Sequence, residues 1–270
     1  MSSDYNFCFP LDLSQLENDR LKLVPFDTNI DLHANLYTSH TTSTPAALVN
    51  FDYLPYGPFS TPEDFLNWYN PHIRDQINVV WFAIFVKPKD GAVKHGDEVP
   101  DGSRFAGVIS YLNADVGMAS VELGHLNILP PHQRTFVNTH ACGLLLNYAL
   151  NPPAGVTINA PSLYTPQTPR LVSGPGGLGL RRAQWFANAL NAPSRRAAER
   201  LGYQYEGTLR WHRILPAHKI DKLGSEDTEK KRPWNDNRGS ARDSVVLGLC
   251  WDDWLQNGGR EHVQKLMARV

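Results

Sequence analysis

One stretch of the chain, from Glu122 to Asn138, carries the residue types best suited to chemistry: E-L-G-H-L-N-I-L-P-P-H-Q-R-T-F-V-N. An apolar strand ends at a Pro-Pro corner, a short polar turn follows, and a helix begins. Backbone N–H groups at a helix start lack intrahelical partners and carry partial positive charge, so such a turn can hold a diphosphate. Gln133, Arg134 and Thr135 add side-chain donors. An ordinary connection between a strand and a helix has the same pattern, and both interpretations stay open.

A second polar stretch surrounds Asn191 and Ser194 and precedes another helical segment. Asparagine three residues before serine at a helix start is first a capping arrangement and only second a ligand site. Other site classes fit poorly. His125, His132 and His140 are spread over a strand, a turn and a helix with no cysteine or carboxylate pattern of a metal site. We therefore predict no bound metal.

Hydrophobic periodicity predicts the elements that must position these residues. The chain alternates strands and helices, and its first strands form hairpins before helical crossovers begin, which predicts a mixed sheet in one α/β domain. We expect strands at 20–26, 78–86, 104–112, 118–129, 181–187, 203–214 and 244–251, and helices at 29–36, from Thr61 onward, 135–150, 194–201 and 251–268. Long polar or Pro-rich loops are expected at 151–179 and 216–239.

Composition narrows the class of protein. The 270 residues include 26 basic and 27 acidic ones, and a net charge of −1 offers no general attraction to nucleic acid or acidic membranes. No apolar run reaches the length of a membrane-spanning helix. The three scattered cysteines are typical of reduced thiols, so we expect a cytoplasmic protein.

Taken together, these stretches resemble the GNAT superfamily of acyl-CoA-dependent N-acetyltransferases, in its RimJ/RimL-like branch. The resemblance spans roughly residues 21–254 and depends on an ordered set of motifs: E-L-G-H, Q-R-T, G-L-R-R-x-x-W, N-x-P-S-R-R-A-A-E-R-L-G-Y-x-x-E-G and R-D-S-V. It implies the GNAT fold, a mixed central sheet of about six to seven strands flanked by helices. Residues 1–19 would form an N-terminal extension and residues 20–270 a single acyltransferase domain.

The resemblance also implies acetyl-CoA as the acyl donor. The family's pyrophosphate loop aligns with Gln133, Arg134, Thr135, Phe136, Val137 and Asn138, where Phe136 replaces the first glycine and Asn138 the second small residue. Glycine normally allows close approach of phosphates, so the binding geometry stays open. Leu126, Asn127 and Ile128 would bond the pantetheine arm, with an N–H near Leu126 polarising the thioester carbonyl. Asn191 would hold the far side of the arm.

Catalysis in this family needs a neutral amine, and an alkyl ammonium must first lose its proton. Glu122 stands where some members carry the general base; a packing or surface acid is the alternative. Many members use a tyrosine to protonate the thiolate, but Ala198 occupies that position. Ser194 is the candidate acid, while helix capping, contact with CoA or a proton from solvent remain alternatives.

Substrate contacts are expected from the aromatic loop between Tyr53 and Phe59. Tyr56 and Phe59 either form a wall of the acceptor-binding site or pack within the hydrophobic core. His125 lies on the opposite strand face from Glu122 if no bulge intervenes, and it either binds substrate or packs internally. Trp185 and Trp211 are expected to pack against the sheet.

The function implied is transfer of an acetyl group to a primary amine by direct attack in a ternary complex. Small-molecule amines are favoured over protein N-termini because the long loops could enclose the acceptor, although the same loops could instead build a protein-docking face. The alternative is a catalytically inactive acyl-CoA-binding or regulatory protein, and a different acyl donor also stays open. We expect no nucleic-acid or membrane partner, and a homodimer is possible because dimers are common in the superfamily.

Overall fold

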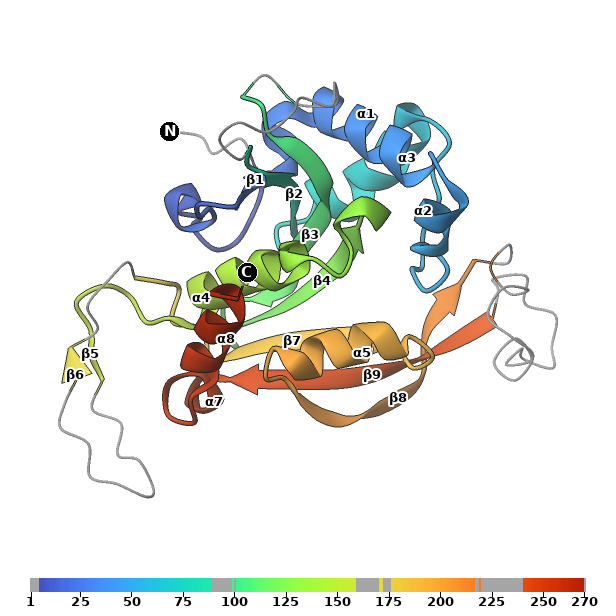
Figure 1. Cartoon of the computed structure of the whole chain (residues 1–270). Helices are drawn as coiled ribbons and strands as arrows, with labels where there is room; N and C mark the ends of the chain where they lie inside the picture. The colour runs from blue at the N-terminus through green and yellow to red at the C-terminus, as the bar shows by residue number, and fades with distance from the viewer. Residues whose placement is uncertain are drawn as a thin grey trace.

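A seven-stranded mixed sheet forms the centre of the molecule (Figure 1). The computed structural model describes residues 5–88, 99, 101–158, 170–171, 176–216, 219 and 240–269. The strand order is β1-β2-β3-β4-β7-β9-β8, and every neighbouring pair is antiparallel except β4 and β7. The strands are β1 Leu21–Pro25, β2 Val80–Val86, β3 Arg104–Asp115, β4 Ser120–Ile128, β7 Arg182–Asn188, β8 Gln204–Leu215 and β9 Ser240–Cys250. This architecture confirms the predicted mixed sheet of about six to seven strands.

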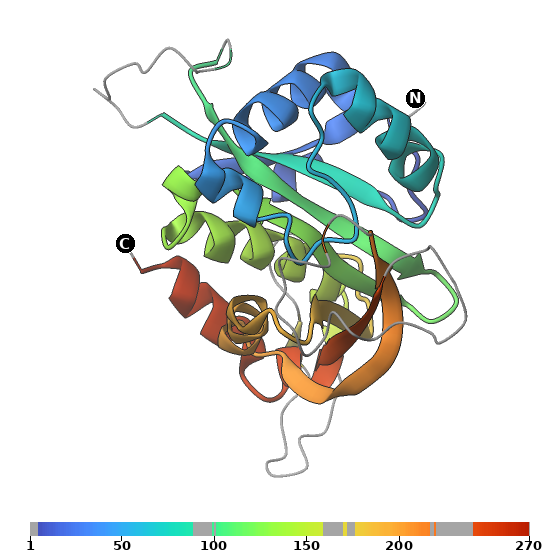
Figure 2. The same ribbon diagram turned by 90° about the vertical axis from the view of Figure 1, so that its right-hand side faces the viewer.

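Helices cover both faces of the sheet, and each face has its own apolar cluster. The α4 face buries residues of α4, α5 and α8 against the sheet, including Ala141, Ala198 and Val263. The α1 face buries an aromatic cluster around Tyr37 and Phe65. Figure 2 shows α1 to α3 gathered on one side of the N-terminal strands. The helices are α1 Ile30–Thr41, α2 Pro45–Val49, α3 Pro62–Tyr69, α4 Phe136–Leu150, α5 Ala192–Arg200, α7 Trp251–Leu255 and α8 Gly259–Met267.

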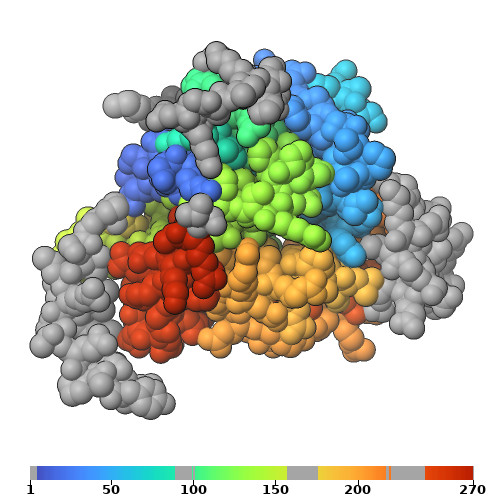
Figure 3. All heavy atoms as spheres, in the orientation of Figure 1, coloured from blue at the N-terminus to red at the C-terminus, as the bar shows by residue number. Residues whose placement is uncertain are grey.

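Local capping signals set several helix starts. The Thr61 hydroxyl oxygen accepts a hydrogen bond from the Asp64 N–H at 3.1 Å, and Pro62 occupies the first position of α3, as predicted. The single C-terminal helix predicted over 251–268 is wrong. Gly258, with φ +82°, adopts the left-handed conformation between α7 and α8, which ends one helix before the next begins. Figure 3 shows these C-terminal helices beside α5 on the α4 face.

The two long loops predicted from sequence lie largely outside the described residues. Positions 159–169, 172–175, 217–218 and 220–239 belong to this part of the chain. Within the first loop the structure places a short antiparallel pair, β5 Thr157–Ile158 and β6 Arg170–Leu171. Residues 5–19 pack on the α4 face, where Leu16 is fully buried. In the described part of the chain, no helix has the length and apolar character needed to cross a membrane.

Candidate functional site

The sheet opens between its two parallel strands. β4 and β7 pair only from Ser120 with Arg182 as far as Glu122 with Gln184. Both strands then continue, β4 to Ile128 and β7 to Asn188, without pairing to each other. Helices α4 and α5 follow the ends of these strands and pack on the same face (Figure 1). Two helix N-termini therefore flank one opening, and Glu122 lies where the strands separate.

The free edge of β4 presents backbone groups to this opening. The Leu129 N–H donates to the Ala106 carbonyl at 3.0 Å, and alternation along the strand turns Asn127 toward β3 as well. Leu126 and Ile128 consequently point their N–H and C=O groups away from β3. Gly107, with φ +134°, permits this pairing because a Cβ there would lie 2.1 Å from the Asn127 carbonyl oxygen.

Asn50 braces the end of β4 and was not predicted from sequence. Its Nδ2 atom donates to the Ile128 carbonyl at 2.9 Å and to Asn127 Oδ1 at 2.8 Å. Gln133 Nε2 donates to Asn50 Oδ1 at 2.9 Å and to the Ile128 carbonyl at 3.0 Å. Asn50 thus links the side chains of Asn127 and Gln133, and both Asn50 and Gln133 hold the Ile128 carbonyl. Asn50 directly follows α2, which the sequence analysis missed although Thr44 caps it and Pro45 occupies its first position, as Thr61 and Pro62 do for α3.

The turn before α4 has the form that sequence predicted. Thr135 caps the helix: its hydroxyl accepts from the Val137 N–H at 3.3 Å and donates to the His132 carbonyl at 2.6 Å. Arg134 takes the left-handed conformation, with φ +58°. Gln133, Arg134 and Thr135 are exposed on the surface beside the opening. This places polar groups and a helix N-terminus where an anion can reach them.

Phe136 begins α4 in ordinary helical conformation, so its backbone does not require the glycine of the family's loop. Its ring packs edge-on against His140, with centroids 5.2 Å apart, and the Arg20 guanidinium lies 3.7 Å above the ring centroid. Asn138, the other replacement, accepts a weak hydrogen bond from Cys142 Sγ at 3.6 Å. The Phe136 ring is therefore turned toward β1 and along α4.

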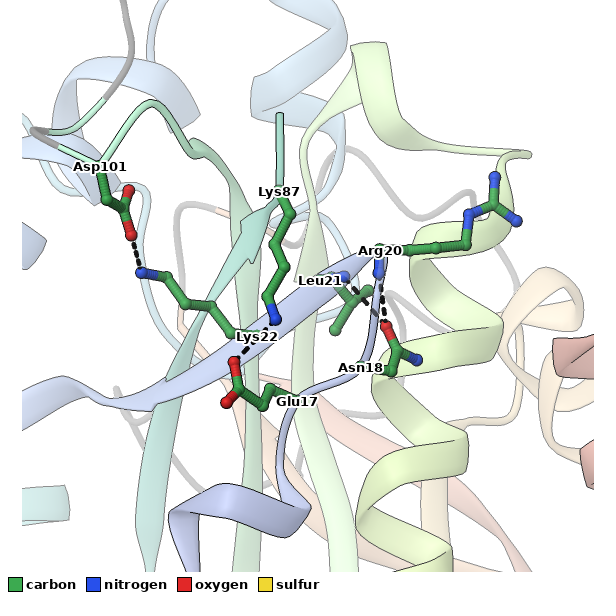
Figure 4. A network of polar contacts seen from close by, with 7 residues as sticks. All are labelled: Glu17, Asn18, Arg20, Leu21, Lys22, Lys87 and Asp101. Carbon is green, nitrogen blue, oxygen red and sulfur yellow. Dashed lines mark hydrogen bonds and ion pairs between the residues drawn. The ribbon is translucent and has the colours of Figure 1, made fainter. Parts of the chain in front are cut away.

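Arg20 reaches this position because a polar network holds the start of β1 (Figure 4). Asn18 Oδ1 accepts from the backbone N–H groups of Arg20 at 2.9 Å and Leu21 at 3.0 Å. Two ion pairs tie β1 and its approach to neighbouring segments, Glu17 with Lys87 at 2.8 Å and Lys22 with Asp101. These exposed pairs add little stability. The Arg20 backbone is held by Asn18, and the Arg20 side chain extends toward the start of α4.

Glu122 is buried, with 5 % of its surface exposed. Asn113 Nδ2 donates to its Oε2 atom at 2.6 Å. Burial raises the pKa of Glu122 to about 7, although the Asn113 contact, the charges of Arg213 and Arg242 and the Phe186 N–H oppose the rise. The carboxyl group therefore exchanges a proton near neutral pH, as a general base must.

His125 occupies a bulge that reverses the expected alternation. Its φ is +47°, and the β3–β4 register shifts between Ser110 and Val108 on the opposing strand. The ring contacts Trp81, with centroids 5.2 Å apart, so His125 shares the α1 face with Glu122 rather than facing away from it. Burial and the Arg213 charge lower the pKa of His125 to about 3, and the imidazole is neutral.

Tyr56 and Phe59 belong to the aromatic cluster of the α1 face, with 4 % and 8 % of their surfaces exposed. The Tyr56 hydroxyl oxygen lies 2.9 Å from His125 Nδ1, and its ring lies 4.2 Å from that of Trp68. This position matches the packing interpretation of the loop. The expectation for Trp211 is wrong: it is 50 % exposed, because a local bulge turns its backbone to φ +57°.

Asn191 and Ser194 lie at the start of α5, across the opening from β4. Asn191 Oδ1 accepts from the Ser194 N–H at 3.1 Å, which confirms the capping interpretation of the sequence. The buried Trp185 donates from Nε1 to Ser194 Oγ at 3.0 Å. Since indole nitrogen is only a donor, the serine acts as acceptor in this bond and its own O–H remains available to donate.

One side-chain group among the described residues has ligand atoms spaced for a metal ion. Cys250, Asp252 and Asp253 bring such atoms within 4.8 Å of one another. Cys250 and Asp253 form the capping box of α7, and Asp253 also accepts from Gln204 at 2.6 Å. The histidines considered in the sequence do not belong to this group.

Comparison with known proteins agrees with this geometry. Residues 20–204 match the model of the acetyltransferase (GNAT) domain. No curated protein matches the sequence significantly. Solved structures with the same fold include a GCN5-related N-acetyltransferase from Brucella melitensis, at 20% identity and a TM-score of 0.63, covering 94% of this chain and 85% of that one. A GNAT-family protein from Chromobacterium violaceum has 20% identity and a TM-score of 0.60, covering 93% and 99%.

A further structure is the spermidine N-acetyltransferase of Vibrio cholerae in complex with CoA and spermine. It has 14% identity and a TM-score of 0.50 and covers 88% of this chain and 100% of that one. At such low sequence identity these structures show only that the fold is shared. The family model shows the family, because it matches well over half of the chain. This chain belongs to the GNAT family of acetyltransferases, enzymes that transfer an acetyl group from acetyl-CoA.

Proposed function

We propose that this protein transfers an acetyl group from acetyl-CoA to the primary amine of a small molecule, with Glu122 as the general base. The observation that carries the proposal is the position of Glu122 where β4 and β7 separate, with a pKa raised to about 7. A buried carboxyl group at that point is placed to take a proton from an amine inside the opening. Ser194, on the far side, supplies a hydroxyl donor.

The described residues fit the acetyl donor. The opening offers the free edge of β4 at Leu126 and Ile128, the exposed polar turn at Gln133–Thr135 and the N-termini of α4 and α5. The backbone of Leu126 and the N–H of Ile128, whose carbonyl already accepts from Asn50 and Gln133, would bond the pantetheine arm from one side and Asn191 from the other. The turn before α4 would hold the pyrophosphate. Asn127 would act as a brace through Asn50.

Acetyl-CoA supplies the thioester, whose carbonyl carbon forms a C–N bond with the amine as the C–S bond breaks. The Leu126 N–H would polarise that carbonyl. Glu122 would accept the proton that the amine loses, and Ser194 or solvent would return one to the thiolate. The position of Ser194 at the start of α5 supports assignment to the RimJ/RimL-like branch.

A second candidate is an acyl-CoA-binding protein without turnover, because buried Ala198 occupies the position of the tyrosine acid that many members carry. A thermal-shift titration with acetyl-CoA, CoA and ATP, followed by an assay of thiol release with an amine panel, separates the two. Ligand at a hundred times its Kd adds about 2.7 kcal/mol, or roughly 5–10 °C for this size. A shift with both CoA species but not ATP, together with amine-dependent release, supports the enzyme. A shift without release supports the binding protein.

A further inference from the structure

Two arginines face each other on a part of the sheet that extends beyond β7. The pairing of β7 with β9 ends at Asn188 with Ser244, whereas β8 and β9 continue to pair from Arg213 with Arg242 to Leu215 with Ser240. In Figures 1 and 2 this two-stranded extension runs toward the loop after α2. Contact is direct, since Arg242 donates to the Tyr53 carbonyl at 3.2 Å.

The register places this arginine pair on the same sheet face as Glu122. Glu122 pairs with Gln184, and Gln184 pairs with Gly248 of β9. Directly paired residues share a face, and residues two apart along a regular strand do so too. Counting back from Gly248 along β9 by twos reaches Arg242, whose partner on β8 is Arg213. Both guanidinium groups therefore belong to the α1 face of the sheet, where Glu122 also lies.

The described residues give this pair no ion-pair partner, and the acid among them whose charge acts on Arg242 is Glu122, the proposed base. Among the described residues, Arg242, which is 8 % exposed, bonds only the neutral oxygens of Tyr53 and Ser244, and its buried Nε has no partner. Arg213 is exposed, and neither arginine forms an ion pair within the described ranges. The charges of both arginines act on Glu122, and that of Arg213 also acts on the neutral His125. A buried cation without a counter-ion is costly unless a ligand supplies one.

We propose that the amine substrate carries an anionic group, a carboxylate or a phosphate, which Arg213 and Arg242 hold while the amine lies at Glu122. This inference rests on the proposed function and defines its substrate class. Guanidinium groups match the planar, bidentate geometry of carboxylate and phosphate oxygens. A polyamine would instead bring further positive charge toward two arginines, so spermidine and spermine are expected to be poor acceptors.

The test compares acceptors that differ only in the anion. Thiol release from acetyl-CoA is measured with glycine, β-alanine, 4-aminobutanoate and the protein amino acids, each beside its amide, with phosphoethanolamine beside ethanolamine, and with spermidine. In the pair that contains the best acceptor, wild-type kcat/KM should be at least tenfold higher for the anionic compound than for its neutral counterpart. Arg213→Gln should lower that value about 10- to 100-fold, as expected for a lost charged hydrogen bond, and change the neutral member less than threefold. Arg213→Lys should recover part of the loss.

Arg210→Gln provides the matched control, because Arg210 is also exposed on β8, three residues earlier. It should leave the preference for anionic acceptors intact. The inference is overturned if amides or spermidine are the better acceptors, or if no carboxylate or phosphate acceptor is acetylated. It is also overturned if Arg213→Gln shifts the pH profile equally for both members of a pair, which would assign the arginine to tuning Glu122. If calorimetry shows that the wild-type protein does not bind acetyl-CoA, the proposed function itself is refuted.

Discussion

Replacing Glu122 with glutamine tests the proposed base with little change in shape. Glutamine keeps an oxygen that can accept the hydrogen bond from Asn113 Nδ2, now 2.6 Å from Glu122 Oε2. It also resembles the protonated carboxyl group, which burial favours at this position. The variant therefore retains the packing of the α1 face and loses only the capacity to take a proton.

The expected loss of rate follows from the role and from the pKa. Removal of a general base typically costs about 10²- to 10⁴-fold in kcat. Because the pKa of Glu122 is raised to about 7, wild-type kcat/KM should rise with pH up to neutrality and level off above it. At one pH unit below the pKa about a tenth of the carboxyl groups are ionised, so the rate there should be about a tenth of its plateau. Glu122→Gln should lose this dependence along with the rate.

The same pKa predicts an effect on stability that does not depend on any substrate. A carboxyl group whose pKa is 4.5 when exposed and about 7 when folded stabilises the fold in its protonated form. That stabilisation is fully present below pH 4.5 and is lost as the pH rises through 7. It amounts to about 3 kcal/mol. In Glu122→Gln this part of the pH dependence of unfolding should vanish.

The assays are thiol release between pH 5.5 and 8.5 and urea unfolding at pH 5 and pH 8. Glu199→Gln, which removes an exposed acid from its pair with Arg195, is the control and should change kcat less than twofold. A Glu122→Gln enzyme with at least a third of wild-type kcat and the same pH profile would refute the assignment of the base. If Glu122→Gln unfolds with the same pH dependence as the wild-type protein, the raised pKa of Glu122, on which the assignment depends, is refuted.

Three further substitutions probe the surroundings of the opening. Phe136→Gly should lower the free energy of unfolding by about 1–3 kcal/mol, because it removes the contacts with Arg20 and His140, yet leave the acetyl-CoA Kd in calorimetry within threefold. Tenfold tighter binding would mean that the ring obstructs the site. Ser194→Ala should reduce kcat about tenfold at unchanged acetyl-CoA KM. This loss is smaller than the usual effect of removing a general acid, because a thiolate is a good leaving group even without protonation. Equal rates would leave solvent as the proton donor. Lys219→Met should cost about 3 kcal/mol in urea unfolding, because Lys219 donates to the carbonyls of Phe51, Leu54 and Tyr56. A change below 0.5 kcal/mol would contradict this role.

The sequence was most informative where the signal is local. The cap at Thr61, the Pro-Pro corner before α4 and the cap at Asn191 each involve residues within a few positions of one another, and the structure confirms all three. The ordered motifs also located the seven-stranded sheet and the position of Glu122 within it. Alternation failed at His125, because a bulge depends on the opposing strand. There, the Ser110 hydroxyl donates to the Gly124 carbonyl at 2.9 Å, a contact between strands that one strand's pattern cannot show.

The acceptor side of the opening was the part least predictable from sequence, because contacts between residues far apart in the chain set its geometry. The loop after α2 follows from no periodic pattern, yet four of its carbonyl groups are held by two buried cations, Lys219 and Arg242, more than 160 positions later. In sequence each cation stands in or beside a long polar loop, where charged residues usually face solvent. Burial changes what they do: Lys219 donates to three carbonyl oxygens of the loop, whereas Arg242, on the face that holds Glu122, has no partner for its Nε among the described residues. From that difference we infer that Lys219 fastens the loop, and it supports the proposal that Arg242, with Arg213, selects the acceptor by its charge.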